Sequence, residues 1–221
     1  MPLEQPNMKH GTCVSLPAVF HVGNLDGDRT KPYISNEGME LSVSIHPDVW
    51  QRIMQGGGTP ESEPTYTYKL SHADAEFYLV DPTDSLDTER QWCLNNGYVA
   101  EANGYRVTYE TVDGEAAYME FGDEDTATAE ADERDGEVEN VDILELAANG
   151  IEYWESAFEQ SPNAAESITI EGLLPIWYAK QAGYDGVWWD EQLAPQKFSA
   201  PRGAIFQDKL GQFTREVINT D

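Results

Sequence analysis

Apolar and polar residues alternate over several short segments of the chain, which is the period of a strand with one buried face. Strands are predicted by this alternation or by a short apolar run at 18–22, 39–45, 65–70, 77–80, 105–111, 116–121, 167–170, 184–189 and 204–206. Val112-Asp113-Gly114-Glu115 stands between the fifth and sixth segments, and Asp-Gly between alternating runs is typical of a β-hairpin. We therefore expect mostly antiparallel strands.

Four other segments predict helices, at 47–55, 86–94, 142–158 and 173–182. Pro47 suits a first helical position because its missing N–H has no intrahelical partner there, and Gly183 is expected to end the last helix. Asp142 and Glu145 have the spacing of a capping box. After Asp142, apolar residues recur at steps of three and four, and these are Leu144, Ala147, Ile151, Trp154 and Phe158.

Two segments show neither the strand period nor the helix period. Residues 1–16 are expected to form a loose polar lead-in. Residues 122–140 are mainly Asp, Glu, Ala and Thr, which predicts a solvated or mobile acidic insertion. Residues 17–221 contain no internal repeat and no clear linker, so we expect a single domain around that insertion. The predicted class is α+β, with helices packed on mostly antiparallel strands.

The charge of the chain limits its partners. Its 221 residues include 41 acidic and 13 basic side chains, a net charge of −28, which repels nucleic acids and anionic membranes. Three explanations remain open. The protein belongs to a salt-loaded cytoplasm, it imitates a nucleic acid and docks on a basic partner, or it is an acidic globular protein with one acidic insertion. The run 122–139 is then either a solvated insertion or a surface offered to a basic protein.

The two cysteines and the apolar content indicate a cytoplasmic protein. Cys13 and Cys93 form no disulfide framework, so we expect both to be reduced thiols. The N-terminal residues lack the apolar stretch of a signal peptide. No run of about 18 apolar residues is present, so we expect no membrane span.

Several common catalytic motifs are missing from the sequence. It has no GxGxxG after a strand, no GxxxxGK[ST], no HExxH, no paired CxxC and no GxSxG. His10 and Cys13 have a metal-like spacing, but no second pair accompanies them, so no metal site is expected.

Three stretches resemble the ADP-ribosyltransferase superfamily, in particular phage and toxin-type mono-ADP-ribosyltransferases, some of which act against host defence. These are VFHVG at 19–23, GMELSVSIHPDVWQRI at 38–53 and GYDGVWWDEQLAPQKFSAPRGAIF at 183–206. The resemblance implies two small antiparallel sheets that form an NAD cleft, flanked by helices. It also implies NAD as substrate, release of nicotinamide and transfer of ADP-ribose to a macromolecule. A protein is the expected target because the net charge opposes a nucleic acid.

The first two stretches carry the residues that the resemblance assigns to NAD binding. His21, in an aromatic-His-x-Gly motif with Gly23, corresponds to the histidine that contacts the ribose. Ser42 and Ser44 correspond to the polar positions that shape the nicotinamide pocket. Simpler explanations stand beside these assignments. His21 is then a strand histidine bonded to a backbone carbonyl, and the two serines form the solvent face of a strand.

The third stretch carries the acid. Loss of nicotinamide develops an oxocarbenium-like cation, which a nearby carboxylate stabilises, and Asp190 or Glu191 corresponds to that carboxylate. Many family members place a glutamate at the head of the last strand, where this sequence has Arg202. Either the acid has moved to the preceding strand end, or the protein is a degenerate, non-catalytic member. The alternative outside this family is a non-catalytic acidic binding protein. Arg202 is expected to bind the pyrophosphate of NAD or to pair with a surface acid.

Overall fold

The computed structural model describes residues 13–23, 25, 39–56, 66–81, 86–111, 114, 116–160, 169–191, 193 and 199–218. It confirms the α+β class, with five α-helices and two sheets in these ranges. The chain forms two compact units. The large unit comprises Met1–Trp92 and Trp154–Asp221, and the small unit is Cys93–Tyr153. The segment 17–221, expected as a single domain, thus encloses a compact unit of its own.

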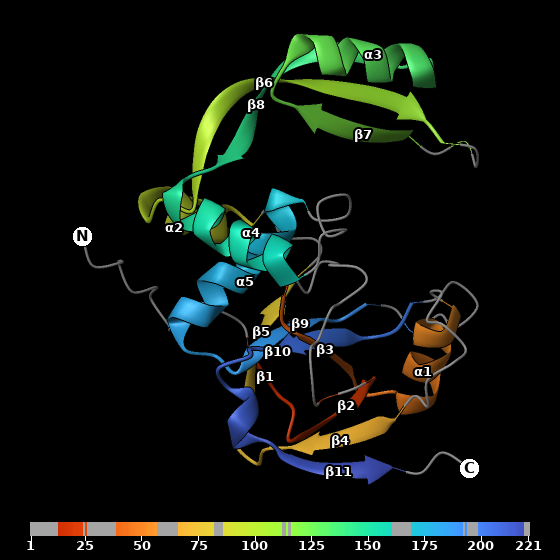
Figure 1. Ribbon diagram of the computed structural model, residues 1–221, viewed down its shortest axis with the longest axis vertical. Coiled ribbons are helices and arrows are strands. Elements are labelled where there is room, and N and C mark those ends of the chain that lie inside the picture. Colours follow the sequence, from red (N-terminus) through yellow and green to blue (C-terminus); the bar gives the residue numbers. More distant parts are fainter. Residues whose placement is uncertain are drawn as a thin grey trace. The chain divides into compact units, whose positions relative to one another are not determined.

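An eight-stranded sheet runs through the large unit in the order β1-β5-β9-β10-β3-β2-β4-β11 (Figure 1). The strands are β1 (Cys13–Ser15), β2 (Ala18–Val22), β3 (Leu41–Ser44), β4 (Thr67–Ser71), β5 (Glu76–Val80), β9 (Gly186–Trp189), β10 (Arg202–Ile205) and β11 (Thr214–Ile218). β5 and β9 are parallel, whereas the other neighbours are antiparallel. The prediction of two small antiparallel sheets is wrong for this one, which is large and mixed. The helical connection between β5 and β9 permits their parallel pairing.

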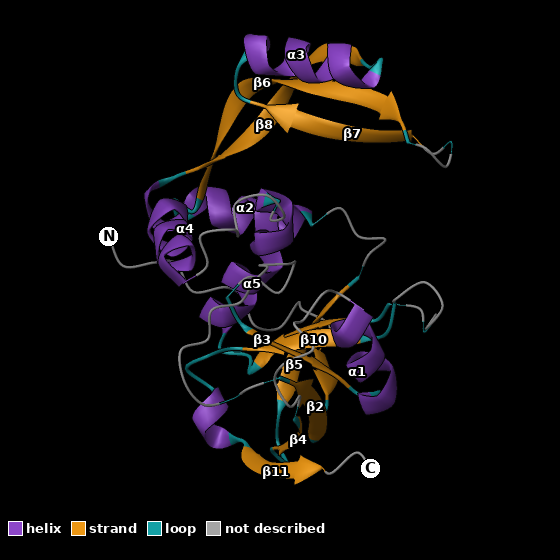
Figure 2. Cartoon of the chain, turned by 45° about the vertical axis from the view of Figure 1, so that its right-hand side comes forward, coloured by secondary structure: helices purple, strands orange, loops and turns teal. Residues whose placement is uncertain are grey.

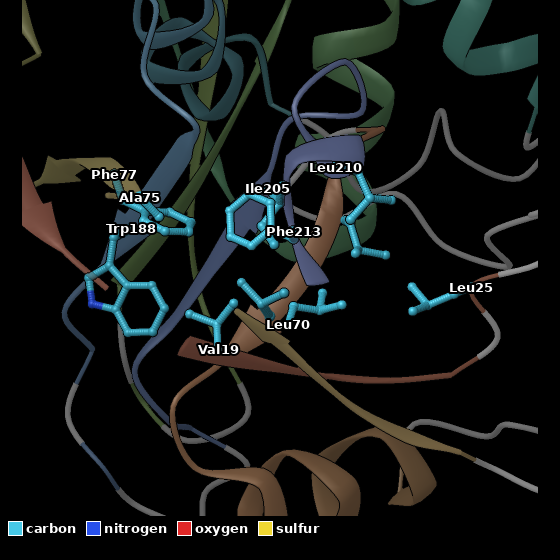
Figure 3. Close-up of a cluster of buried hydrophobic side chains, with 11 residues drawn as sticks. Val19, Leu25, Leu70, Ala75, Phe77, Trp188, Ile205, Leu210 and Phe213 are labelled. Carbon is cyan, nitrogen blue, oxygen red and sulfur yellow. The ribbon is translucent and has the colours of Figure 1, made fainter. Parts of the chain in front are cut away.

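One face of this sheet carries the hydrophobic core of the large unit. Alternate residues of neighbouring strands meet there because side chains in a strand alternate between the two faces. The buried cluster comprises Val19, Leu25, Leu41, Val43, Leu70, Ala75, Phe77, Trp188, Ile205, Leu210 and Phe213 (Figure 3). Phe77 and Trp188 make an edge-to-face ring contact with centroids 6.2 Å apart. The alternation and the short apolar runs in the sequence therefore located the main core strands.

Two helix ends follow the predicted residues, at Pro47 and Gly183. The helices with residues in the large unit are α1 (Pro47–Gly56), α2 (Asp87–Asn95), α4 (Ala148–Gln160) and α5 (Ile170–Ala182). α1 begins at Pro47 as predicted, and α5 ends at Gly183, which adopts the left-handed conformation with φ of 88°. The Thr169 side chain accepts a hydrogen bond from the Gly172 N–H, so α5 starts at Ile170. The predicted strand 167–170 is therefore wrong at Thr169 and Ile170, and its first two residues lie outside the described residues.

The small unit is a three-stranded antiparallel sheet with one helix on it (Figure 2). Its strands are β6 (Val99–Glu110), β7 (Ala116–Phe121) and β8 (Glu137–Leu146), and its helix is α3 (Glu124–Arg134). β6 pairs with both other strands. The predicted hairpin between 105–111 and 116–121 is confirmed, with Gly114 at φ of 80° in its turn.

The acidic run is ordered. Most residues of the predicted insertion at 122–140 are exposed, as expected of a solvated segment, but they form regular structure. Asp123 caps α3, accepting a hydrogen bond from the Thr126 N–H at 2.8 Å, and β8 begins at Glu137. The predicted helix from Asp142 is wrong at its start, since residues up to Leu146 pair with β6 and α4 begins at Ala148. Pairing between strands overrides the helical spacing there.

Strands β1 and β11 add two edges that the sequence pattern did not predict. Cys13–Ser15 belongs to the expected lead-in but pairs with β5, and β11 pairs with β4. None of the helices in the described ranges is both long and apolar enough to cross a bilayer.

Candidate functional site

The three stretches that carry the family resemblance lie side by side in the large sheet. The first contains β2, the second contains β3, and the third contains β9 and β10, which are consecutive in the order β9-β10-β3-β2 (Figure 1). A single row of paired residues crosses all four strands, from Trp189 through Arg202 and Ser44 to Phe20. Segments far apart in the sequence therefore meet at one place in the fold.

β2 and β3 are neighbours in the sheet but are paired only briefly, and we call this place the division between β2 and β3. Their register contains one residue pair, Phe20 with Ser44, whereas β2 pairs with β4 over five residues. At the division, Nδ1 of His21 lies 2.8 Å from the Ser42 carbonyl oxygen. A carbonyl only accepts, so Nδ1 carries a hydrogen and donates it. The side chain of His21 thus adds a bond between the two strands beside their one paired position.

Gly23 leaves room beside the histidine ring. It has a φ of 140°, a region that side-chain-bearing residues rarely adopt. A Cβ at this position would lie 3.0 Å from Nε2 of His21. The glycine of the aromatic-His-x-Gly motif therefore keeps a side chain away from the second nitrogen of His21, whose own side chain is 9% exposed.

The hydroxyl of Ser44 forms hydrogen bonds within the fold. Ser44 is fully buried, its hydroxyl donates to the Pro201 carbonyl at 2.6 Å, and it accepts from the His46 N–H at 3.2 Å. These bonds tie the start of β10 to the turn that leads into α1. Ser42 is half-buried, and its backbone carbonyl receives the bond from His21. Of the two serines, Ser42 is the one whose side chain retains some exposure.

Glu191 and Arg202, two of the residues singled out in the sequence, form an ion pair. Oε1 of Glu191 accepts from Nε of Arg202 at 2.9 Å and lies 2.8 Å from its Nη2. Oε2 of Glu191 has a longer contact of 3.5 Å with the Ser199 hydroxyl. Of the two roles expected for Arg202, the structure contains the pairing with an acid. Asp190 is exposed directly after β9.

Strand alternation places these groups on different faces of the sheet. Phe20, Ser44, Arg202 and Trp189 occupy paired positions and therefore share one face. His21 follows Phe20, so it lies on the other face, with the buried core residue Val19. His21 and Arg202, the partner of Glu191, therefore lie on opposite faces of the sheet.

A buried carboxylate next to β3, that of Glu40, was not among the residues predicted from the sequence. Glu40 is 1% exposed and accepts from Nζ of Lys180 at 2.9 Å and from the Gln207 N–H at 2.7 Å. Asp208 lies 3.7 Å from the same ammonium group. These bonds join the start of β3, the helix α5 and the end of β10. Nothing in the local sequence indicates them, because the partners are more than a hundred residues away.

A second buried acid, Glu89, lies among tyrosines. The Tyr78 hydroxyl donates to its carboxylate, and Tyr178 and Tyr184 both have ring centroids 5.5 Å from that of Tyr78. Burial raises the pKa of Tyr78 strongly, and the hydrogen bond and charge of Glu89 raise it further. Burial likewise raises the pKa values of Tyr178 and Tyr184. This cluster holds α2 and α5 against β5.

No group of three His, Cys, Asp or Glu side chains within the described ranges could hold a metal ion. His10, whose spacing from Cys13 is metal-like, lies outside those ranges. Comparisons of the chain with models of protein families, with curated proteins and with solved structures gave no match.

Proposed function

We propose that the large unit binds NAD at the division between β2 and β3 and transfers ADP-ribose to a protein, with release of nicotinamide. The observation that carries the proposal is the adjacency of the three stretches that resemble ADP-ribosyltransferases, with His21 bridging the division. In that reaction the bond between nicotinamide and the ribose C1 breaks, and nicotinamide leaves with the electron pair. An acceptor atom of the target then bonds to C1 and loses its proton.

His21 and Gly23 form the NAD-binding part of the proposed site. Because Nδ1 of His21 is held by the Ser42 carbonyl, the ring orientation is fixed and Nε2 is the nitrogen directed toward a ribose hydroxyl. Gly23 adds no side chain of its own next to that nitrogen. Ser42 lines the same division from β3.

Glu191 is the proposed acid. It is half-buried, and Arg202 restricts the position of its carboxylate through two contacts to one oxygen. A carboxylate fixed in this way stabilises the cation that forms as nicotinamide leaves. Trp189, which pairs with Arg202 across β9 and β10, is also half-buried and offers a flat surface for an aromatic ring. Asp190 adds a second, exposed carboxylate beside them.

A protein fits the acceptor better than a nucleic acid does. The net charge of −28 opposes the approach of a phosphate backbone, whereas a protein with basic groups is attracted.

The binding step is tested by the effect of NAD on the melting temperatures of the wild type, His21→Ala and His72→Gln. His72 lies outside the proposed site and makes a tilted ring contact with Phe213, so its variant is the control for loss of a histidine. NAD at about a hundred times its Kd adds about 2.7 kcal/mol of stability. We expect that increase in the wild type and in His72→Gln, and its loss in His21→Ala.

Two results would contradict the binding step. An equal increase in His21→Ala would remove this residue from the site. No increase in the wild type would favour the alternative, a non-catalytic acidic binding protein.

A further inference from the structure

The small unit concentrates the charge of the protein. Residues 93–153 contain 17 acidic and 2 basic side chains, a net charge of −15 out of the total of −28. The two basic residues are Arg106 and Arg134. With so little positive charge of its own, this unit has a strong attraction for a basic partner.

Both arginines are already paired within the unit. Nη2 of Arg106 lies 2.7 Å from Glu120, and its Nη1 lies 3.6 Å from Glu139. Nε of Arg134 lies 2.9 Å from Glu130, one turn earlier in α3. Residues 93–153 contain no other arginine or lysine, so the acidic side chains of this unit far outnumber its cations.

The two faces of the small sheet differ. α3 covers one of them, where Val107, Ala127 and Ala131 are buried together (Figure 2). The opposite face carries the side chains between these positions, because neighbours in a strand point to opposite sides. We call this surface the acidic face, and the register assigns to it Arg106, Thr108, Glu110, Tyr118, Glu120, Glu137 and Glu139. Five of the seven residues are exposed, namely Thr108, Glu110, Tyr118, Glu137 and Glu139.

Tyr118 gives this face a preference for arginine. Its side chain is 61% exposed, although it is a large aromatic residue. The guanidinium carbon of Arg106 lies 4.7 Å from the centre of its ring, so the ring already stacks with one guanidinium. An exposed ring surrounded by carboxylates suits further guanidinium groups, which stack on aromatic rings and pair with two carboxylate oxygens at once.

The acids of the acidic face do not converge on an ion. No group of three potential ligands capable of holding a metal occurs in the part of the chain that the structure describes. The carboxylates are instead spread over three neighbouring strands, an arrangement that fits an extended, positively charged surface.

We propose that the acidic face docks an arginine-rich segment of a partner protein. The charge, the exposed ring and the open side of the sheet all favour such a segment. The proposal does not depend on NAD chemistry in the large unit.

The test compares two variants of the full chain that lose the same charge from the same unit. One changes the acidic face, with Glu110→Gln, Glu137→Gln and Glu139→Gln, and leaves the pair of Arg106 and Glu120 intact. The other changes exposed acids of α3, with Asp125→Asn, Asp132→Asn and Glu133→Gln. The probe is a fluorescent peptide of alternating arginine and threonine, measured by anisotropy at about 0.15 M salt. Melting curves confirm that each variant is folded.

We expect the acidic-face variant to bind the peptide at least about tenfold more weakly than the α3 variant does. Tyr118→Ala should also weaken binding, and a peptide with lysine in place of arginine should bind less tightly. Equal losses in the two charge variants would overturn the proposal, because diffuse charge would then account for the binding. Absence of peptide binding to the wild type, or tighter binding of a DNA duplex, would also overturn it.

Discussion

Arg202 directs both Nε and Nη2 at one oxygen of Glu191, at 2.9 and 2.8 Å. The two residues lie eleven positions apart; Arg202 is on β10, and Glu191 is the second residue after β9. The pair therefore closes the connection between these two strands and fixes the carboxylate that we propose as the acid of the site.

The stability of this pair should depend on salt. Both side chains are partly exposed, at 23% and 32%, so we expect a coupling energy of about 0.5–1 kcal/mol at low salt and a smaller one at about 1 M salt. Urea unfolding of the wild type, Arg202→Gln, Glu191→Gln and the double variant measures it as a double-mutant cycle. A coupling that is absent at low salt would show that the pair contributes nothing to folding.

Replacement of Gly23 should be costly. Gly23→Ala places a Cβ 3.0 Å from Nε2 of His21 and forces alanine to adopt a φ of 140°, so we expect a loss of about 1–3 kcal/mol in the free energy of unfolding. Gly211→Ala is the control, because a Cβ there meets no atom within 4 Å, and its effect should stay within about 1 kcal/mol. Equal effects in the two variants would contradict the conformational role of Gly23.

Loss of charge at Glu40 should destabilise the large unit. Glu40→Gln removes the carboxylate that receives bonds from Lys180 and the Gln207 N–H, and we expect a loss of about 2–3 kcal/mol. Asp208→Asn is the matched control, because Asp208 is 59% exposed and lies 3.7 Å from the same ammonium group. Its effect should be below about 1 kcal/mol. Similar losses in both variants would contradict the prediction, because the burial of Glu40 would then not explain its effect on stability.

The buried tyrosines should make the protein less stable in alkali. The pKa of Tyr78 is raised in the folded state by burial and by Glu89. Above about pH 10, unfolded tyrosine loses its proton while Tyr78 keeps it. The free energy of unfolding should therefore be unaffected by Tyr78 below that pH and fall as the pH rises above it.

Urea unfolding between neutral and alkaline pH measures this decline. In Tyr78→Phe, the free energy of unfolding should fall less steeply with pH. Tyr66 is 47% exposed, so Tyr66→Phe should keep the wild-type dependence on pH. An unchanged slope in Tyr78→Phe would contradict the assignment.

Much of the strand pattern could be predicted because alternation and short apolar runs report directly on burial. The segments 18–22 and 77–80 were found in this way, as were the ends at Pro47 and Gly183, whose backbone requirements are local. The sequence also contains features that predict α3, although this helix was not predicted. Asp123 precedes it, acids occupy its first turn, Arg134 stands in its last turn, and Ala127 and Ala131 are four residues apart.

The other strands and the side-chain contacts of the site depend on residues that are far apart in the sequence. β8 is a strand because β6 pairs with it, and no local pattern separates it from the helix predicted at Asp142. The sequence singled out both Glu191 and Arg202 but left their pairing open. It gave no sign that the hydroxyl of Ser44 would be used by Pro201 and the His46 N–H, since such contacts arise only once the strands are paired.

Nicotinamide release from NAD tests the central proposal most directly. It is measured for the wild type and for Asp190→Asn/Glu191→Gln, with the NAD-dependent melting shift of both proteins recorded alongside. We predict slow release by the wild type, and a reduction of at least about a hundredfold in the double variant with the melting shift preserved. Undiminished release by the double variant would remove these acids from the mechanism, and no release by the wild type would contradict the transferase itself.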